Sequence, residues 1–384
     1  MKKSKRNESN GNYSAKIKVV GVGGGGGNAV SRMCNDLGIR GVDFIAINTD
    51  AQDLDYCRAK RKIYIGKNLT RGLGTGMNPD LGRQAAEENR AEIVEALKGA
   101  DLVFITAGLG GGTGSGAGPM VAEAVKESGA LTIAVVTKPF TFEGAQRSRI
   151  AQEALVKLKE KVDTLIVIPN DRIFTIVRKD TPLLKAFEYI DDVLRAAVQG
   201  IAELIAVPGI INLDFADVKA VMKDAGPALV GIGLGGGQDR ALTAVNQVVN
   251  SPLLEVSIDG AKGVLFGVAG NRDLKMNEIN EIAKVIAASV DPGAKIIFGA
   301  YYDRKLRPGQ LKVTLIATGF NGQLVRAEPP AATLFSDQLK ALQIQTREKE
   351  KMPEEKKSKT MEKIEKKKEE TDVWEIPAFL RRKK

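Results

Sequence analysis

One glycine-rich run, Gly110-Gly111-Gly112-Thr113-Gly114-Ser115-Gly116, has the residue types that bind phosphate. An apolar stretch over 101–107 precedes it and predicts a buried strand, and the composition of 119–128 predicts a helix. Between a strand and a helix, glycines let successive backbone N–H groups close around phosphate oxygens, and the helix dipole favours the negative charge. The run therefore predicts an anion site.

Two more glycine clusters occupy 21–27 and 71–79. The first follows a short strand and fits the pattern G-x-G-x-x-G, with Asp43 and Asp50 downstream. Taken alone, this pattern predicts a dinucleotide-dependent dehydrogenase, but that function leaves the run at 110–116 unexplained. The chain contains no G-x-x-x-x-G-K-[ST] motif, which argues against a Walker-type nucleotidase.

A pair of carboxylates, Asp214 and Asp217, stands three residues apart at the start of an expected helix, just after Asn212. One carboxylate is enough to cap a helix, so capping accounts for only one of them. The two carboxylates share one helix face, so capping leaves the second without an explanation.

Alternating elements must position these residues. Strands are expected over 17–20, 42–47, 101–106, 131–136 and 164–168, and helices over 27–37, 79–97, 117–128 and 146–160. This alternation predicts a doubly wound α/β fold with a parallel sheet, which binds ligands at the carboxyl ends of its strands.

A long amphipathic helix is expected over 182–207. Its stripe of apolar residues is so wide that the helix is expected to be buried between two halves of the protein. A second, smaller α/β block follows, with strands over 228–234, 263–269, 295–301 and 311–317 and helices near 239–250 and 275–289. The glycine run 231–237 is expected to be a turn between a strand and a helix.

Composition excludes several kinds of chemistry. The 384 residues include no histidine, which removes Ser-His-Asp catalysis and HExxH zinc sites. The net charge is +10, but residues 1–12 carry +3 of it and residues 345–384 carry +4. This distribution argues against a protein that binds nucleic acid. Two cysteines and the absence of a long apolar run favour a cytoplasmic protein without a transmembrane helix.

The string GGGTGSG at 110–116, with the other two glycine clusters in the same order, resembles the FtsZ family of bacterial cell-division GTPases within the tubulin/FtsZ superfamily. The likeness extends from about Ile17 to Gly319 and resumes in the last fourteen residues. It implies GTP and GDP binding with Mg²⁺ at the phosphates, and it assigns no protein ligand to the metal. The second domain that it implies contains a mixed sheet. The nucleotide contacts that the resemblance implies are Gly23, Gly24, Gly25, Asn28, Asn48, Gly74, Thr75, Gly108, Gly110, Gly111, Gly112, Thr113, Gly114, Glu143, Arg147, Asn170, Phe187 and Asp191.

Some of these residues have plainer interpretations. A carboxylate at Asp191 can accept from guanine N1–H and N2–H₂, which adenine does not offer, and Phe187 can stack on the base. From pattern alone, Phe187 also fits a core position. Likewise, Glu143 and Arg147 fit either ribose and phosphate contacts or an exposed pair.

The resemblance also implies how the protein acts. Asn212, Asp214 and Asp217 match the family's catalytic loop, which works on the nucleotide of the neighbouring subunit, so head-to-tail stacking completes each site. Two competing functions are a dinucleotide-dependent dehydrogenase and a filament that partitions plasmids or phages. The expected location is the cytoplasm, at the mid-cell division ring.

The expected organisation ends in a tail that binds a partner. Residues 371–384 resemble the peptide that docks membrane-tethering proteins such as FtsA, with Glu375 in place of the usual aspartate. Weak membrane contact through Trp374, Phe379 and the last basic residues is the competing interpretation, without insertion. The expected segments are a disordered basic N-terminus (1–12), a GTP-binding domain (13–181), a central helix (182–207), a C-terminal α/β domain (208–321), a flexible, disordered charged linker (322–370) and the peptide (371–384).

Overall fold

The structure, a computed structural model, describes residues 15–36, 41–178, 180–207, 209–251, 257–303 and 305–320, all of which belong to one compact unit. The expected segments 1–12, 322–370 and 371–384 lie outside these residues. Six parallel strands form the first half of the sheet in the order β3-β2-β1-β4-β5-β6. These are β1 (Ile17–Val22), β2 (Val42–Asn48), β3 (Arg61–Tyr64), β4 (Leu102–Gly108), β5 (Leu131–Lys138) and β6 (Thr164–Pro169).

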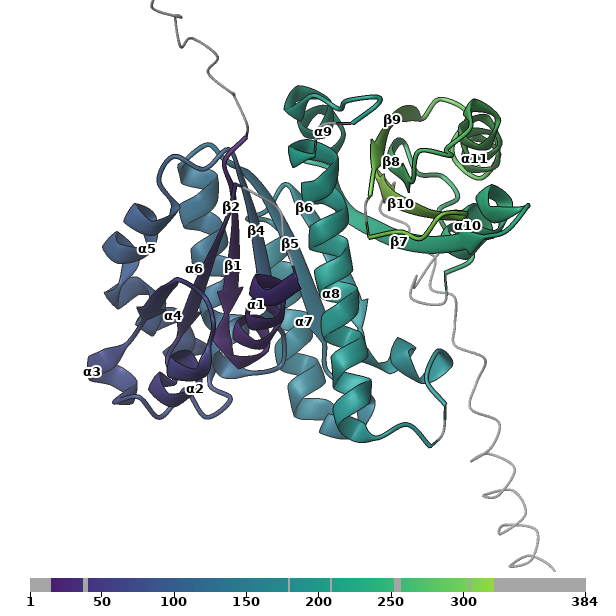
Figure 1. The fold of residues 1–384 in the computed structure, drawn as a ribbon. Coiled ribbons are helices and arrows are strands. Elements are labelled where there is room, and N and C mark those ends of the chain that lie inside the picture. Colours follow the sequence, from purple (N-terminus) through teal and green to yellow (C-terminus); the bar gives the residue numbers. More distant parts are fainter. Residues whose placement is uncertain are drawn as a thin grey trace, which may run out of the picture. The chain divides into compact units, whose positions relative to one another are not determined.

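Helices cover both faces of this half, which confirms the doubly wound fold (Figure 1). One face packs on α1 (Gly23–Asp36) and α8 (Leu183–Ala206). The other packs on α4 (Pro79–Glu88), α5 (Arg90–Leu97), α6 (Gly112–Glu127) and α7 (Ala145–Lys159). Within β4, Phe104 faces the first layer and Val103 and Ile105 face the second, as the two-residue period of a strand requires.

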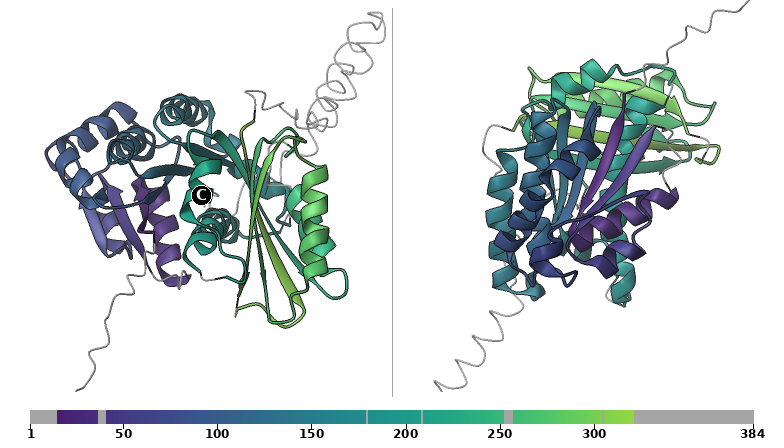
Figure 2. Two further views of the ribbon diagram at one scale, coloured as in Figure 1. Left: turned by 90° about the horizontal axis from the view of Figure 1, so that it is seen from above. Right: turned by 90° about the vertical axis from the view of Figure 1, so that its left-hand side faces the viewer.

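The second half of the sheet is mixed. Its strands are β7 (Gly226–Gly236), β8 (Gly263–Gly270), β9 (Lys295–Tyr302) and β10 (Gln310–Thr318), and β10 runs antiparallel to β7 and β8. Parallel pairing of β7 with β6, from Thr164–Gly226 to Ile166–Ala228, joins the halves into one ten-stranded sheet. Figure 2 shows α8 between the two halves. α10 (Arg240–Val249) and α11 (Met276–Ala288) cover the outer face.

Two helices begin earlier than expected because their glycines are helical. α1 begins at Gly23 rather than at residue 27, and α6 begins at Gly112 rather than at residue 117. The predicted helix over 79–97 is interrupted at Asn89, which separates α4 from α5. β3 and the short helices α2 (Ala51–Tyr56), α3 (Lys67–Thr70), η1 (Thr141–Glu143) and η2 (Asn170–Thr175) were not expected. These elements are too short for their periodicity to be distinctive.

The prediction of a turn over 231–237 is wrong, because β7 continues to Gly236. Its glycines are needed where α10 packs directly on the strand. A Cβ on Gly233 would lie 2.0 Å from the carbonyl oxygen of Ala244, and one on Gly235 would lie 1.8 Å from that of Arg240. Among the described residues, no helix is long and apolar enough to cross a membrane.

Candidate functional site

A pocket with a volume of about 760 Å³ borders the carboxyl ends of the parallel strands. The first turns of α1 and α6 meet there, and only glycine permits their approach. A Cβ on Gly23 would lie 2.9 Å from the backbone nitrogen of Gly114 on α6, and one on Gly25 would lie 3.3 Å from that of Gly108 at the end of β4. Two helix N-termini and their unpaired backbone N–H groups therefore serve one pocket, an arrangement that favours phosphate.

Buried hydroxyl groups hold the glycine run 110–116 in place. Thr113 Oγ1 lies 2.7 Å from Thr49 Oγ1, directly after β2, and 3.2 Å from Thr75 Oγ1, in the glycine cluster 71–79. Gly110 N donates to Ser115 Oγ over 2.9 Å, which closes the loop onto its own helix. These contacts hold the glycine clusters 71–79 and 110–116 in one arrangement before any ligand binds.

Asn170, directly after β6, carries an unsatisfied acceptor in the pocket. Its side chain is buried, and among the described residues Oδ1 has no hydrogen-bond partner. A buried unpaired amide oxygen costs about 1–3 kcal/mol, which a ligand hydroxyl or N–H would recover. The pocket is therefore built for a polar ligand.

Glu143 and Arg147 lie on the pocket wall but bind one another. Arg147 Nη1 donates to Glu143 Oε2 over 2.6 Å, and Phe140 N donates to Glu143 Oε1 over 2.9 Å. The carboxylate is thus held at the start of α7 with one face toward the cavity. Its lone pairs still allow it to accept from a ligand hydroxyl.

An aromatic side chain, Phe187, lines the pocket. Phe187 contacts the fully buried Phe140 edge-to-face, with ring centroids 5.6 Å apart. Phe187 is itself 41% exposed, so it is not a plain core residue, and its ring is available for stacking.

Asp191, one turn further along α8, faces the same cavity with a side chain that is only 17% exposed. Burial, together with the neighbouring carboxylates of Asp192 and Glu188, raises its pKa to about 6. The guanidinium of Arg32, on α1, opposes this rise because its Nε lies 2.9 Å from Asp191 Oδ2.

The structure brings most of the expected nucleotide contacts to this pocket. The expected residues among its lining are Gly23, Gly24, Gly25, Asn28, Thr75, Gly108, Gly111, Gly112, Thr113, Gly114, Glu143, Arg147, Asn170, Phe187 and Asp191. Asn48, Gly74 and Gly110 are not among the lining residues, and their contact with a nucleotide stays a prediction. Asn48 is instead buried, where Nδ2 donates to Asp53 Oδ2 over 2.8 Å.

Sequence reasoning missed several lining residues, of which Arg32 and Ser31 on α1, Arg58 and Thr137 are polar. A signal for Arg32 existed. It follows Asn28 by four residues, so a helix that presents Asn28 to the pocket presents Arg32 on the same side.

The acidic pair lies elsewhere. Asp214 occupies the N-cap position of α9 (Phe215–Met222), yet its exposed side chain makes no capping hydrogen bond. Asn212 Oδ1 accepts from Gly209 N over 2.6 Å, which shapes the turn before α9. Figure 1 shows α9 at the end of α8 opposite to α2 and α3. At a rise of about 1.5 Å per residue, Asp191 and the end of α8 at Ala206 are about 22 Å apart.

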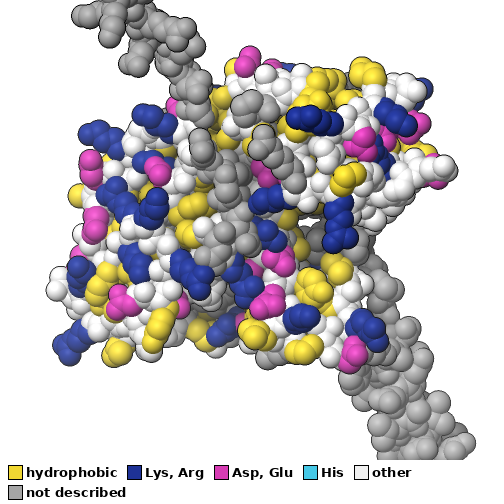
Figure 3. Space-filling view, in the orientation of Figure 1, with side chains coloured by type: hydrophobic (Ala, Val, Ile, Leu, Met, Phe, Trp, Pro, Cys, Tyr) yellow, Lys and Arg dark blue, Asp and Glu magenta, His cyan; other side chains and the backbone are white. Residues whose placement is uncertain are grey.

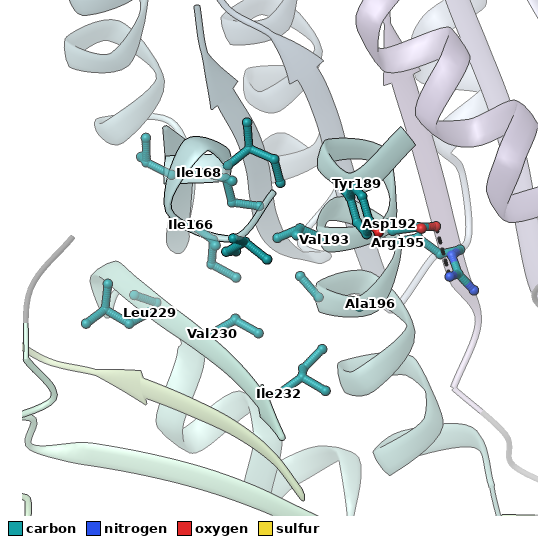
Figure 4. Close-up of a pocket in the computed structure, with 15 residues that line it drawn as sticks. Ile166, Ile168, Tyr189, Asp192, Val193, Arg195, Ala196, Leu229, Val230 and Ile232 are labelled. Carbon is teal, nitrogen blue, oxygen red and sulfur yellow. Dashed lines mark hydrogen bonds and ion pairs between the residues drawn. The ribbon is translucent and has the colours of Figure 1, made fainter. Parts of the chain in front are cut away.

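A second cavity of about 320 Å³ lies between α8, β6 and β7 (Figure 4). Its walls are mainly aliphatic, from Ile166, Ile168, Val193, Val230 and Ile232. Arg195 turns outward and donates from Nη2 to Asp192 Oδ1 over 3.0 Å. Because it has no glycine cradle, this cavity does not suit a phosphate ligand.

The first pocket, in contrast, fits a nucleoside phosphate in all its parts: a glycine cradle, an unpaired amide oxygen, an aromatic ring and a buried carboxylate. A dehydrogenase with one glycine loop does not use the run at 110–116, whereas here both runs border one site. Among the described residues, no cluster of three or more Cys, Asp or Glu side chains could hold a metal ion.

Comparison with known proteins agrees with this geometry. Residues 16–178 match the family model for the Tubulin/FtsZ family, GTPase domain, and residues 226–321 match that for the FtsZ family, C-terminal domain. An empty FtsZ dimer from M. jannaschii is 50% identical, with a TM-score of 0.76 over 80% of this chain and 89% of that chain.

Two more distant structures share the fold. CetZ2 from Haloferax volcanii, a GTPγS-bound protofilament, is 23% identical, with a TM-score of 0.68 over 79% of this chain and 92% of that one. CetZ1 from the same organism, a GDP-bound monomer, is 22% identical, with a TM-score of 0.69 over 80% and 95%. With half of its residues identical to FtsZ over most of both chains, and with both domain models matched, this chain belongs to the FtsZ family of tubulin-like GTPases.

Proposed function

We propose that this protein hydrolyses GTP as a head-to-tail filament, in which each pocket is completed by the acidic loop of the next subunit. The observation that carries the proposal is the separation of the pocket from Asp214 and Asp217 by the length of α8. A single rigid subunit holds the phosphates at one end and the carboxylates at the other. A second copy stacked along α8 would bring the two together, and repetition of that contact makes an open filament.

Each group has a role in this scheme. The N-termini of α1 and α6 bind the phosphates, Asn170 and Glu143 bind the ribose, and Phe187 and Asp191 bind guanine. Asp214 and Asp217 of the neighbouring copy orient a water for attack on the terminal phosphate. Mg²⁺, bound to the phosphate oxygens, would supply charge neutralisation.

Exposed apolar side chains at the pocket end support a subunit contact. Tyr56, Leu73, Phe142 and Leu184 are 65–85% exposed and belong to segments at this end of the molecule. In Figure 3, apolar side chains occur along the lower edge of the face shown, where the strands end in Figure 1. Exposed apolar surface of this kind favours association.

Mixing two inactive variants tests the shared site. Asp214→Asn keeps the pocket and lacks the acid, whereas Asp191→Asn keeps the acid and lacks the guanine acceptor. We expect little phosphate release from either alone. A 1:1 mixture regains activity wherever an intact pocket meets an intact acidic loop, which in random order is about one contact in four.

Sedimentation with GTP and Mg²⁺ shows whether both variants enter the same pellet. Co-sedimentation without recovered phosphate release would overturn the shared site, as would wild-type hydrolysis that stays proportional to protein concentration without a threshold. ATP and GDP serve as nucleotide controls.

We also propose that the filament builds the division ring in the cytoplasm and that residues 371–384 bind a membrane-tethering protein such as FtsA. The support is the sequence Trp374-Glu375-Ile376-Pro377-Ala378-Phe379-Leu380, whose apolar anchors suit a groove in a partner. Deletion of 371–384 should abolish recruitment to partner-coated vesicles and leave GTP hydrolysis unchanged. Binding to bare anionic vesicles that the deletion removes would favour direct membrane contact instead.

A further inference from the structure

Arg32, on the pocket wall, links α1 to α8. Its side chain is 35% exposed, and Nε lies 2.9 Å from Asp191 Oδ2, while Nη2 lies 3.9 Å from Glu188 Oε1. Asp192 has a cation of its own, because Arg195 donates to it over 3.0 Å. Three acids in this stretch of α8 therefore face two arginines, and Arg32 is the one that pairs with Asp191.

We propose that Arg32 determines base specificity as a positioning residue, because it holds Asp191 as an oriented carboxylate that selects guanine over adenine. This inference rests on the proposed function, since it assumes a guanine nucleotide in the pocket. The contact leaves Asp191 Oδ1 and the second lone pair of Oδ2 for the base.

The selection follows from the donors and acceptors on the base. Guanine presents two donors, N1–H and N2–H₂, and an ionised carboxylate accepts both. Adenine presents an acceptor at N1 beside the donor N6–H₂. A protonated carboxyl group, with one donor and one acceptor, complements adenine and leaves one guanine donor without a partner. The protonation state of Asp191 therefore decides which base fits.

The surroundings of Asp191 make that state sensitive to Arg32. Burial and the charges on Asp192 and Glu188 together raise its pKa to about 6, with the opposing charge of Arg32 in place. Among the groups that affect it, Arg32 is the one that lowers the pKa. Loss of this cation moves the carboxyl toward its protonated form near neutral pH, whereas lysine keeps the charge without the fixed Nε contact.

The test compares Arg32→Gln, Arg32→Lys and the control Glu188→Gln by equilibrium binding of GDP and ADP between pH 6 and pH 8.5. We expect Arg32→Gln to weaken GDP binding about twofold at pH 7 and about fivefold at pH 6, which corresponds to a rise of about one in the pKa of Asp191. The loss should shrink toward pH 8.5, and ADP binding should not weaken. Arg32→Lys should fall between this variant and wild type. Glu188→Gln should bind GDP as wild type does.

Nuclear magnetic resonance of the Asp191 carboxyl carbon in the nucleotide-free protein gives a readout that does not depend on binding. Its midpoint should lie near pH 6 in wild type and higher in Arg32→Gln. Equal losses of GDP and ADP, a loss independent of pH, or a comparable loss in Glu188→Gln would overturn the inference. A wild-type protein that fails to prefer GDP over ADP at every pH would refute the proposed function itself, which is a distinct result.

Discussion

Replacing Asp191 with asparagine should make the nucleotide-free protein more stable while it removes guanine binding. The folded carboxyl has a pKa of about 6, against an ordinary value of 3.8. Its side chain is 17% exposed, so solvent screens the charge only partly. At about 1.4 kcal/mol per tenfold change, the ionised form costs the folded state about 3 kcal/mol relative to the protonated form. Asparagine has nearly the shape of the protonated form and never ionises.

The dependence on pH follows from the sign of the shift. Because the folded carboxyl binds its proton more tightly than the unfolded one, it contributes stability fully below about pH 4, and this contribution is lost as the pH rises toward 6. The variant should therefore exceed wild type by about 3 kcal/mol at pH 7.5 and by about half as much at pH 5.

Urea unfolding of nucleotide-free protein at pH 5, 6 and 7.5 measures both values. Asp192→Asn is the matched control, because its side chain is 50% exposed and pairs with Arg195 at the surface. That control should change stability by less than about 1 kcal/mol at each pH. An Asp191→Asn protein no more stable than wild type at pH 7.5, or a gap that fails to narrow at pH 5, would refute the argument from burial.

Three further predictions test the packing. Gly112→Ala would place a Cβ 2.7 Å from the backbone nitrogen of Asn78, so it should lower the free energy of unfolding by about 1–3 kcal/mol and weaken GDP binding. Its control, Gly118→Ala, would place a Cβ with no atom within 4 Å and should stabilise the protein by about 0.5–1 kcal/mol in urea unfolding. Lys312→Met removes the 2.9 Å contact to the buried Glu203 and should cost about 3 kcal/mol by the same assay, and adding Glu203→Gln should restore most of the loss. Gly233→Ala should lower the melting temperature through its clash with α10 and leave GDP affinity unchanged, since Gly233 is not among the residues that line the pocket.

Much of the fold could be predicted because its strands are apolar runs bounded by breakers. β4 and β5 are buried along almost their whole length, as strands of a covered parallel sheet are, and their sequences consist mainly of apolar residues. The glycine-rich helix starts could not be predicted in the same way, because glycine is a poor helix former. Packing decides their conformation, since a Cβ on Gly116 would lie 2.0 Å from the carbonyl oxygen of Pro79 on α4.

The site was predictable where a motif names a residue and not where only the fold brings residues together. The glycine run identified Gly112 and Gly114 directly. Arg32 belongs to no motif, and its importance depends on α1 lying against α8, two helices separated by about 150 residues. Residue patterns along one helix do not encode that contact. The sequence indicated that one acid of the pair could cap α9, but the lack of a capping bond at Asp214 depends on side-chain direction, which spacing does not determine.

Whether one subunit could bring its own acids to its own pocket depends on how firmly α8 is held. Val198, Ile201 and Ala202 are fully buried between the two halves of the sheet, and full burial of each larger side chain contributes about 1.5–3 kcal/mol. Glu203 adds hydrogen bonds from Tyr301 Oη over 2.8 Å and from Lys312 Nζ over 2.9 Å, which tie the helix to β9 and β10. Moving the acidic loop by the length of α8 would break all of these contacts. A second copy that supplies the loop breaks none of them, and this difference in free energy is the physical reason to expect hydrolysis only after assembly.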